Sequence, residues 1–197
     1  NFNVNLIDVI FITFGFSLIS RETVMPVLVS TLTDSKLAIG MIPAIWALGY
    51  YLPQLATASF TERLRYKKPF VMLVGSVGER FPYFFTAVAI WAFAVAAPSL
   101  TLTLFLFFIG MAAFSAGIAT PAWFDMIAKV IPVQRRGIWS GIGHGVGALL
   151  GFLIGAYVVA QVLENVAYPN NFALLFALAF VFVMISWAGL SLTREPP

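Results

Sequence analysis

Residues 100–127 read LTLTLFLFFIGMAAFSAGIATPAWFDMI and contain one charged side chain, that of Asp125. A helix needs about 20 mainly apolar residues to cross a bilayer, because the hydrocarbon core is about 30 Å thick and a helix rises 1.5 Å per residue. This stretch is long enough and apolar enough to do so. The sequence therefore predicts a transmembrane helix here.

Five other stretches of the chain meet the same test. The six predicted helices cover about 6–32, 37–61, 69–94, 100–127, 138–163 and 171–192. Asn5 and Asp8 are placed to cap the first helix, and a break in it at Arg21-Glu22 remains open, since discontinuous helices often line substrate sites. The loops are short, so neighbouring helices should be antiparallel. The predicted fold is all-α, a single polytopic membrane domain spanning residues 1–197.

The composition of the chain excludes a soluble fold. Its 197 residues are 61% hydrophobic and 10% charged, with a mean hydropathy of +0.96. A soluble domain is typically about 45–50% apolar and about 25% charged. The sequence contains no basic patch interleaved with aromatic residues, so nothing in it predicts nucleic-acid binding. The absence of cysteine excludes disulfides and thiolate metal sites. The first expected partner is the lipid bilayer.

The basic residues predict the orientation of the helices. One side of the predicted bundle carries eight of them in its loops and C-terminal end, namely Arg63, Arg65, Lys67, Lys68, Lys129, Arg135, Arg136 and Arg194. The loops of the other side carry only Lys36. Cytoplasmic loops are enriched in Lys and Arg. Both termini are therefore expected in the cytoplasm, with the protein in a plasma or inner membrane.

Four charges lie deep in the apolar stretches: Arg21 and Glu22 in the first, Glu79 and Arg80 in the third. A charge at a helix centre costs about 2.5–3.5 kcal/mol on insertion scales, so these side chains should be paired or face water. We expect Arg21 to pair with Glu79 and Glu22 with Arg80. Two interpretations stay open: a site for a charged substrate group or a coupling proton, and a structural ion-pair cluster joining the two helices.

Helix packing is the best interpretation of the glycines in the fifth stretch. Gly143, Gly147, Gly151 and Gly155 follow one another at intervals of four, so they share one face and allow another helix to approach closely. His144 is the only histidine and has no neighbours at ligand spacing, which makes it a poor metal candidate. No catalytic or phosphate-binding motif is present. We therefore expect no enzyme activity, no cofactor and no metal.

A weak internal repeat relates the two halves of the chain. Gly15 and Pro26 in the first stretch are 11 residues apart, as are Gly110 and Pro121 in the fourth. Two units of three helices would have opposite orientations in the membrane, and inverted repeats of this kind are a feature of transporters. The pattern favours a 3+3 inverted-repeat bundle.

The loop after the second stretch resembles a motif of the major facilitator superfamily. Residues 58–68 read ASFTERLRYKK, and the family pattern is Gly, three residues, Asp, Arg, one residue, Gly, then basic residues. Glu62 matches the Asp and Arg63 the Arg. Ala58 and Arg65 depart from the two glycines.

Other segments strengthen this resemblance. Asp125 matches the acidic residue that pairs with the loop arginine in that family. The stretch PVQRRG at 132–137 resembles the loop between the fourth and fifth helices, and LTREPP at 192–197 resembles the exit from the sixth. The resemblance implies a cytoplasmic gate made by Glu62, Arg63 and Asp125. The fourth helix lacks the arginine of proton-coupled members and the fifth lacks the Gly-Pro signature of drug antiporters, so a generic solute carrier is favoured.

The resemblance covers the whole chain but only half of a twelve-helix transporter. It implies the N-terminal half of a secondary transporter that moves a small solute by alternating access. Arg21 and Glu22 are the first cavity candidates, with Trp46, Tyr50 and Gln54 behind them. The expected partner is a second six-helix half, from the same chain beyond residue 197, a copy of this chain or another subunit. The alternative is a structural or assembly subunit of a larger membrane complex.

Overall fold

The computed structural model describes residues 1–196, which form helices and no strand. Three helices are long and apolar enough to cross a membrane, Pro98–Val130, Val133–Asn165 and Asn170–Ser191, and Phe2–Leu18 is a shorter apolar helix. Such helices are one of the few structures that satisfy every backbone group inside a bilayer. The predicted all-α class is confirmed, and the protein is a membrane-embedded helical protein.

The helical pieces lie within or close to the predicted stretches. In chain order they are α1 (Phe2–Leu18), α2 (Val24–Leu32), α3 (Lys36–Glu62), α4 (Lys68–Leu73), the π-helix η1 (Val74–Arg80), α5 (Phe81–Phe93), α6 (Pro98–Val130), α7 (Val133–Leu150), the π-helix η2 (Gly151–Gly155), α8 (Ala156–Asn165) and α9 (Asn170–Ser191). The pieces α4, η1 and α5 follow one another without a gap, as do α7, η2 and α8.

The first predicted helix is interrupted, as the open alternative allowed. The hydroxyl of Ser20 accepts hydrogen bonds from the backbone N–H groups of Glu22 and Thr23, both at 3.2 Å. These bonds replace helical ones. Pro26 has no N–H and cannot bond to the carbonyl of Glu22. The chain between α1 and α2 is therefore unwound at Arg21.

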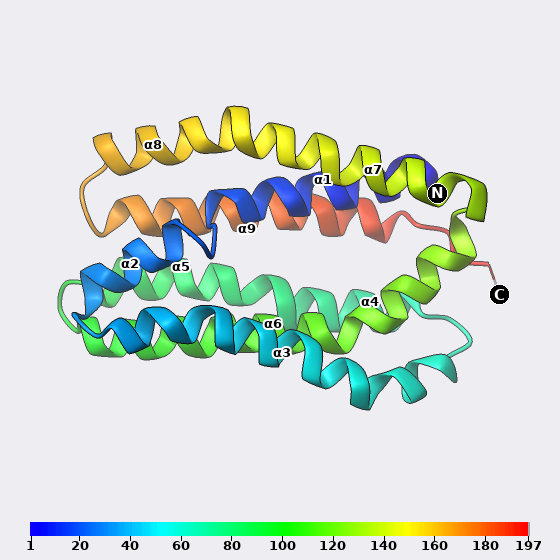
Figure 1. Cartoon of the computed structure of the whole chain (residues 1–197), viewed down its shortest axis with the longest axis horizontal. Helices are drawn as coiled ribbons and strands as arrows, with labels where there is room; N and C mark the ends of the chain where they lie inside the picture. The colour runs from blue at the N-terminus through cyan, green and yellow to red at the C-terminus, as the bar shows by residue number, and fades with distance from the viewer. Residues whose placement is uncertain (197) are drawn as a thin grey trace.

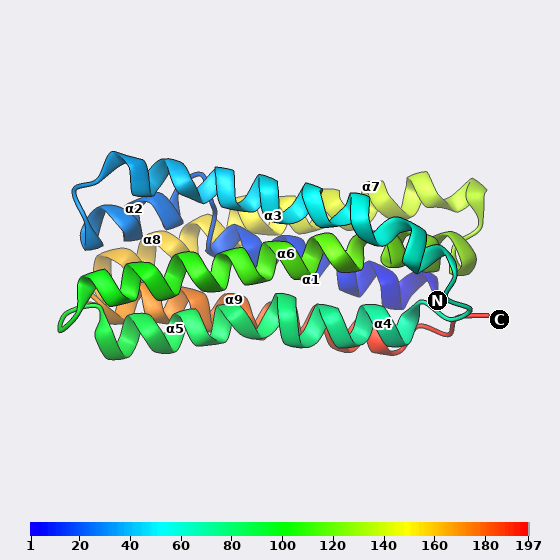
Figure 2. The same ribbon diagram turned by 90° about the horizontal axis from the view of Figure 1, so that it is seen from below.

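The helices pack side by side as a bundle whose long axes are roughly aligned (Figures 1 and 2). Along the bundle, α3 packs on α6, α6 on η1 and α5, α5 on α9, α9 on α1, and α1 on α7. The helices α3 and α7 thus lie at the two ends of this series. A cavity lies between them, on the inner side of α1, η1 and α6.

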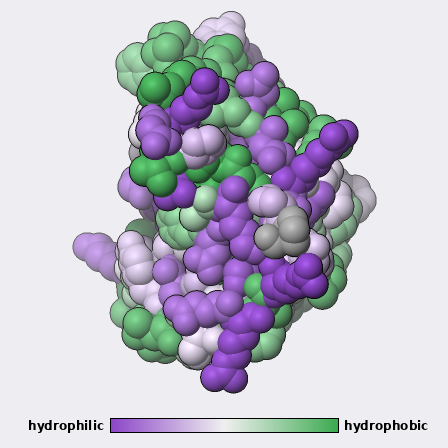
Figure 3. Space-filling view, turned by 90° about the vertical axis from the view of Figure 1, so that its right-hand side faces the viewer, coloured by the Kyte–Doolittle hydropathy of each residue, from purple (hydrophilic) through white to green (hydrophobic). Residues whose placement is uncertain are grey.

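Both termini lie at the same end of the bundle (Figure 1). The side chain of Asn1 donates to the carbonyl of Arg194 at 2.8 Å and accepts from its N–H at 2.8 Å. The loop between α3 and α4 reaches this end too, because Lys129 on α6 donates to the carbonyl of Arg65 at 2.6 Å. Figure 3 shows hydrophilic side chains over much of this end.

Close contact between α1 and the continuous α7–η2 segment depends on glycine. A Cβ atom added to Gly147 would lie 2.9 Å from the carbonyl oxygen of Ile10 and 2.7 Å from Cβ of Thr13. Gly143 faces Val9 in the same way. Gly151 and Gly155 both face Ser17. The four glycines thus form the face on which α1 packs, and this contact places α7 beside the cavity.

Candidate functional site

The cavity has a volume of about 550 Å³ and is lined by α1, η1, α3, α6 and α7. Five of the residues proposed from the sequence line it, namely Arg21, Trp46, Tyr50, Glu79 and Arg80. Glu22 lines a smaller cavity of about 320 Å³ beside it. Gln54 lines neither, and its amide donates to the backbone carbonyl of Tyr50 at 2.8 Å. The large cavity therefore brings together charged residues from the first and third predicted helices.

Arg80 is the centre of a buried charge cluster. Its guanidinium is 4% exposed and lies 3.7 Å from Oδ1 of Asp8 and 3.1 Å from Oε2 of Glu79. Its Nε donates to the carbonyl of Val183 at 3.1 Å, and its Nη1 donates to that of Gly75 at 2.8 Å. Arginine has five N–H donors in a planar fork. Carboxylates and carbonyls on α1, η1 and α9 engage them from several directions.

A π-helical turn makes room for this arrangement. Arg80 ends η1, and single π-helical turns inside α-helices occur frequently at functional sites. A Cβ atom added to Gly75 would lie 2.9 Å from Nη1 of Arg80. Glycine therefore leaves the space that the guanidinium occupies against its own helix.

Asp8 is a site residue that the sequence reasoning assigned incorrectly. It does not cap a helix, because α1 begins at Phe2 and Asp8 is buried within it. Ser186 on α9 donates to its Oδ1 at 2.6 Å, and the indole N–H of Trp123 on α6 donates to its Oδ2 at 3.3 Å. The available signal was an acidic residue flanked on both sides by apolar residues that continue the same helix.

The predicted cross-pairing of Arg21 with Glu79 and of Glu22 with Arg80 is wrong. The guanidinium of Arg80 forms its ion pairs with Glu79 and Asp8. Glu22 instead accepts a hydrogen bond from the Ser20 hydroxyl at 3.1 Å. The physical reason is the break between α1 and α2. It takes Arg21 and Glu22 out of the helical register that the pairing assumed.

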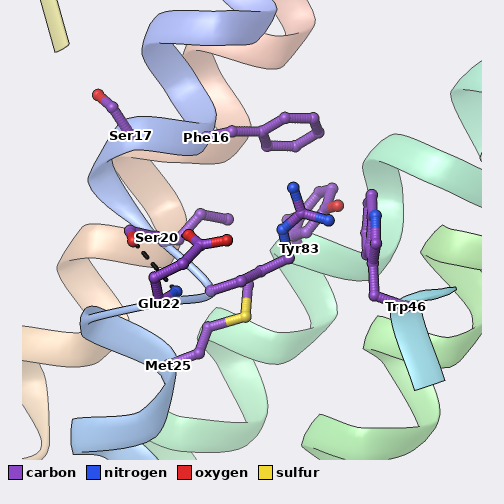
Figure 4. Close-up of a pocket in the computed structure, with 9 residues that line it drawn as sticks. Phe16, Ser17, Ser20, Glu22, Met25, Trp46 and Tyr83 are labelled. Atoms are coloured by element: carbon purple, nitrogen blue, oxygen red, sulfur yellow. Dashed lines mark hydrogen bonds between the residues drawn. The ribbon is translucent and has the colours of Figure 1, made fainter. Parts of the chain in front are cut away.

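Arg21 lies among aromatic rings instead. Its Cζ atom lies 4.2 Å from the ring centroid of Trp46, which is a cation–π distance. Trp46 is stacked on Tyr50, with centroids 6.3 Å apart and 9° between the planes. Phe16 meets both Trp46 and Tyr83 edge-on. Figure 4 shows Phe16, Trp46 and Tyr83 around the smaller cavity, next to the unwound segment that carries Ser20 and Glu22. Arg21 lines both cavities.

At the end with the termini, the expected gate residues are arranged differently from the prediction. Lys67, not Arg63, approaches Asp125, with Nζ 3.7 Å from Oδ2. The Lys67 ammonium also donates to the carbonyls of Thr61 and Glu62 at the end of α3. Arg63 takes part in none of the ion pairs found within residues 1–196. The side chain of Lys67 is buried and that of Arg63 is exposed, so Lys67 holds the loop.

Glu195 completes this cluster, and the sequence reasoning missed it. Its side chain is 2% exposed, accepts the backbone N–H groups of Lys67 at 2.9 Å and Lys68 at 2.8 Å, and lies 3.1 Å from Nζ of Lys129. Burial acts to raise the pKa of this carboxyl, but the hydrogen bonds from Lys67 and Lys68 and the ammonium of Lys129 outweigh it, so the pKa is lowered. The only signal was an acidic residue next to Arg194 in the C-terminal segment.

The wall formed by α6 and α7 contains a polar group without a partner. Trp139 lines the cavity and is 5% exposed, and its indole N–H meets no acceptor in the part of the chain that the structure describes. His144 also lines the cavity. Within residues 1–196, no three His, Asp or Glu side chains gather as metal ligands would.

No protein-family model matches the chain, and neither a curated protein nor a solved structure does. Function must therefore be inferred from the cavity itself. It places a buried charge cluster and a separate, aromatic-bound arginine beside a broken helix in a membrane-embedded protein.

Proposed function

We propose that the chain is the N-terminal six-helix half of a major-facilitator-type secondary transporter that moves a small solute by alternating access. The observation that carries the proposal is the cavity of about 550 Å³ lined by Asp8, Arg21, Glu79 and Arg80. Ionisable groups at membrane depth are costly and usually functional. The break at Arg21 adds support, because transporter sites are typically formed by discontinuous helices.

In this proposal all six helical lengths cross the membrane as two inverted units of three. The approach of the two termini within hydrogen-bonding distance agrees with an even number of crossings. The basic loops support a cytoplasmic location for that end. The segments α1–α2 and α6 are equivalent elements of the two units, with Gly15 and Pro26 in the first corresponding to Gly110 and Pro121 in the second.

The proposal gives the two charged regions different roles. The cavity residues bind the solute, and the cluster of Lys67, Asp125 and Glu195 holds the cytoplasmic ends of α3, α4 and α6 together. A second six-helix half would cover the open side of the cavity between α3 and α7. Rocking of one half against the other would then expose the cavity to each side of the membrane in turn.

Cysteine accessibility tests this proposal, because residues 1–197 contain no cysteine and any cysteine elsewhere in the protein can be replaced by serine. Thr120→Cys places a thiol in the cavity wall, where the hydroxyl lies 3.3 Å from that of Tyr50. The natural full-length protein, in sealed vesicles of each orientation, is treated with a membrane-impermeant thiol reagent. Alternating access predicts labelling from both sides. Leu55→Cys is the matched control, since Leu55 is 82% exposed on the same bundle but lines no cavity.

The outcomes separate the two classes of function. Labelling of Thr120→Cys from both sides, with Leu55→Cys unreactive, supports a transporter. Labelling from one side only would contradict alternating access and favour the structural or assembly subunit.

A further inference from the structure

We propose that the cavity binds an organic monocarboxylate with a flat, apolar body, and that Arg21 receives its carboxylate. This inference rests on the proposed function and specifies the class of solute. It begins from the charges of the cavity. Asp8 and Glu79 are each paired with Arg80. Arg21 takes part in none of the ion pairs found within residues 1–196.

The position of Arg21 leaves its donors available. Its Cζ lies over the ring of Trp46 at 4.2 Å. A planar guanidinium that stacks on an aromatic face keeps its N–H groups at the edge, where a carboxylate can accept two of them. The neighbouring acid, Glu22, forms no ion pair with Arg21 within residues 1–196 and accepts the hydroxyl of Ser20 at 3.1 Å. The cavity therefore holds an oriented cation without an anion.

The surroundings of Arg21 indicate the rest of the ligand. Trp46 and Tyr50 form a continuous stack, with 9° between their planes, and Phe16 meets Trp46 edge-on at 6.3 Å. Such rings offer stacking and edge-to-face contacts to a flat or aromatic group. The cavity volume of about 550 Å³ is in the range of about 300–1,000 Å³ typical of small-molecule sites.

The charge balance limits the number of negative charges that the ligand at Arg21 can carry. With Asp8 and Glu79 ionised, the cluster around Arg80 carries one net negative charge, and Arg21 carries one positive charge. A monocarboxylate brings one unit of negative charge, which a single proton on the pair of Asp8 and Glu79 would cancel. A dicarboxylate or a phosphate dianion would need two. Uncompensated charge is costly in a medium of low dielectric constant.

The site is also confined to one part of a long cavity. From Asp8, α1 continues to Leu18, about 15 Å further along the helix at 1.5 Å per residue, before the break that carries Arg21. Trp123 bonds to Asp8 at 3.3 Å and its ring lies 5.9 Å from that of Trp139, so the unpartnered indole of Trp139 lies near the Asp8 end. The proposed carboxylate site at Arg21 does not depend on that indole.

Direct binding to the natural full-length protein in lipid nanodiscs tests the inference. The probes are benzoate and 2-naphthoate, each compared with its neutral amide, benzamide or 2-naphthamide, by equilibrium dialysis at pH 7. We expect each acid to bind at least tenfold more tightly than its amide. Phthalate, the dianion, should bind more weakly than benzoate. Equal affinity for acid and amide, or tighter binding of phthalate, would overturn the proposal.

Variants assign the preference to Arg21. Arg21→Gln should bind acid and amide equally, whereas Arg21→Lys should retain part of the preference because it keeps the charge. Arg63→Gln is the control, since Arg63 is an exposed arginine of a loop, and it should behave as the wild type. If Arg21→Gln does not fold, Trp46→Leu tests the same site. Removal of its ring should weaken benzoate binding at least threefold. A preference unchanged in these variants would contradict the proposal.

The binding experiments test the class of solute, whereas cysteine labelling tests alternating access, so either proposal can fail without the other. Labelling of Thr120→Cys from both sides without an acid preference would overturn only the substrate class. Acid preference at Arg21 with labelling from one side would leave a carboxylate-binding protein that does not alternate.

Discussion

The guanidinium of Arg80 lies 3.7 Å from the carboxylate of Asp8, and both side chains are 4% exposed. This ion pair joins η1 to α1. Ser186 ties it to α9 through a hydrogen bond to Asp8 at 2.6 Å. Removal of one partner leaves the other as an uncompensated buried charge, which costs far more than loss of an exposed pair. The pair therefore holds three helices in position and supplies the charge at one end of the cavity.

Loss of the Arg80 side-chain charge should destabilise the fold strongly. Arg80→Met keeps much of the side-chain volume but leaves Asp8 and Glu79 without a counter-ion. Breaking a buried pair costs about 3–5 kcal/mol, so we expect the thermal unfolding midpoint in detergent to fall by at least about 6 °C. Arg63→Met, at an exposed position, should leave the midpoint within about 1 °C of wild type, in line with the small effect of most surface substitutions. Equal effects of the two variants would show that the Arg80 cluster does not carry the stability assigned to it.

The docking of Glu195 should depend on pH. The pKa of this carboxyl is lowered from an ordinary value of 4.5 because, against the effect of burial, hydrogen bonds from Lys67 and Lys68 and the charge of Lys129 favour the ionised form. A lowered pKa in the folded state stabilises above the ordinary pKa, and this stabilisation is lost as the pH falls through the folded value. We expect amide hydrogen exchange at Lys67 and Lys68, corrected for the intrinsic rate, to be slow at pH 7 and to accelerate below pH 4.5. In Glu195→Gln the protection should be weak already at pH 7. Full protection of both amides in Glu195→Gln would contradict the role of the carboxylate.

Lys67 should matter more than Arg63 for the loop between α3 and α4. The Lys67 ammonium donates to the last carbonyls of α3 and lies 3.7 Å from Asp125. A cation at a helix C-terminus stabilises it, typically by about 0.3–1 kcal/mol. Lys67→Met should therefore lower the thermal midpoint and make the loop more sensitive to limited proteolysis. Arg63→Met is the matched control and should do neither. The reverse ranking would restore Arg63 to the position first predicted for it.

Substitution by alanine should change protein stability in opposite directions at two glycines of α7. A Cβ atom at Gly147 would meet the Ile10 carbonyl at 2.9 Å, whereas one at Gly145 meets nothing within 4 Å. Gly147→Ala must push α1 and α7 apart, and overpacking typically costs about 1–3 kcal/mol. Gly145→Ala should be neutral or stabilising by up to about 1 kcal/mol, because alanine favours helix more than glycine does. The thermal midpoints of the two variants measure the difference. A midpoint of Gly147→Ala equal to or above that of Gly145→Ala would show that the close packing is not needed.

Much of the fold was readable along the chain. The helices lie close to the predicted stretches because lipid offers no hydrogen bonds, so backbone groups must bond within the helix and the apolar run itself marks its extent. The break near Arg21 was readable only as an alternative. Ser20 and Pro26 allow the chain to unwind there, but the same residues also occur in continuous helices.

The candidate site was readable only as a list of charges. Arg80 and Glu79 were identified because charges in an apolar run are conspicuous. Asp8 was misassigned because an acidic residue near the start of a helix resembles a cap. The sequence predicted Arg63 beside Asp125, whereas Lys67 lies there. Both are basic residues of one loop, and the family motif favoured the wrong one.

The lipid surroundings of this protein, its helical class and the residues whose charge must be compensated all follow from the local excess of apolar side chains along the chain. Only the tertiary structure decided which charges meet. One residue turns a helix by about 100°, so the break before α2 and the π-turn of η1 redirect every side chain beyond them. Arg80 therefore binds Asp8, and Arg21 lies over Trp46.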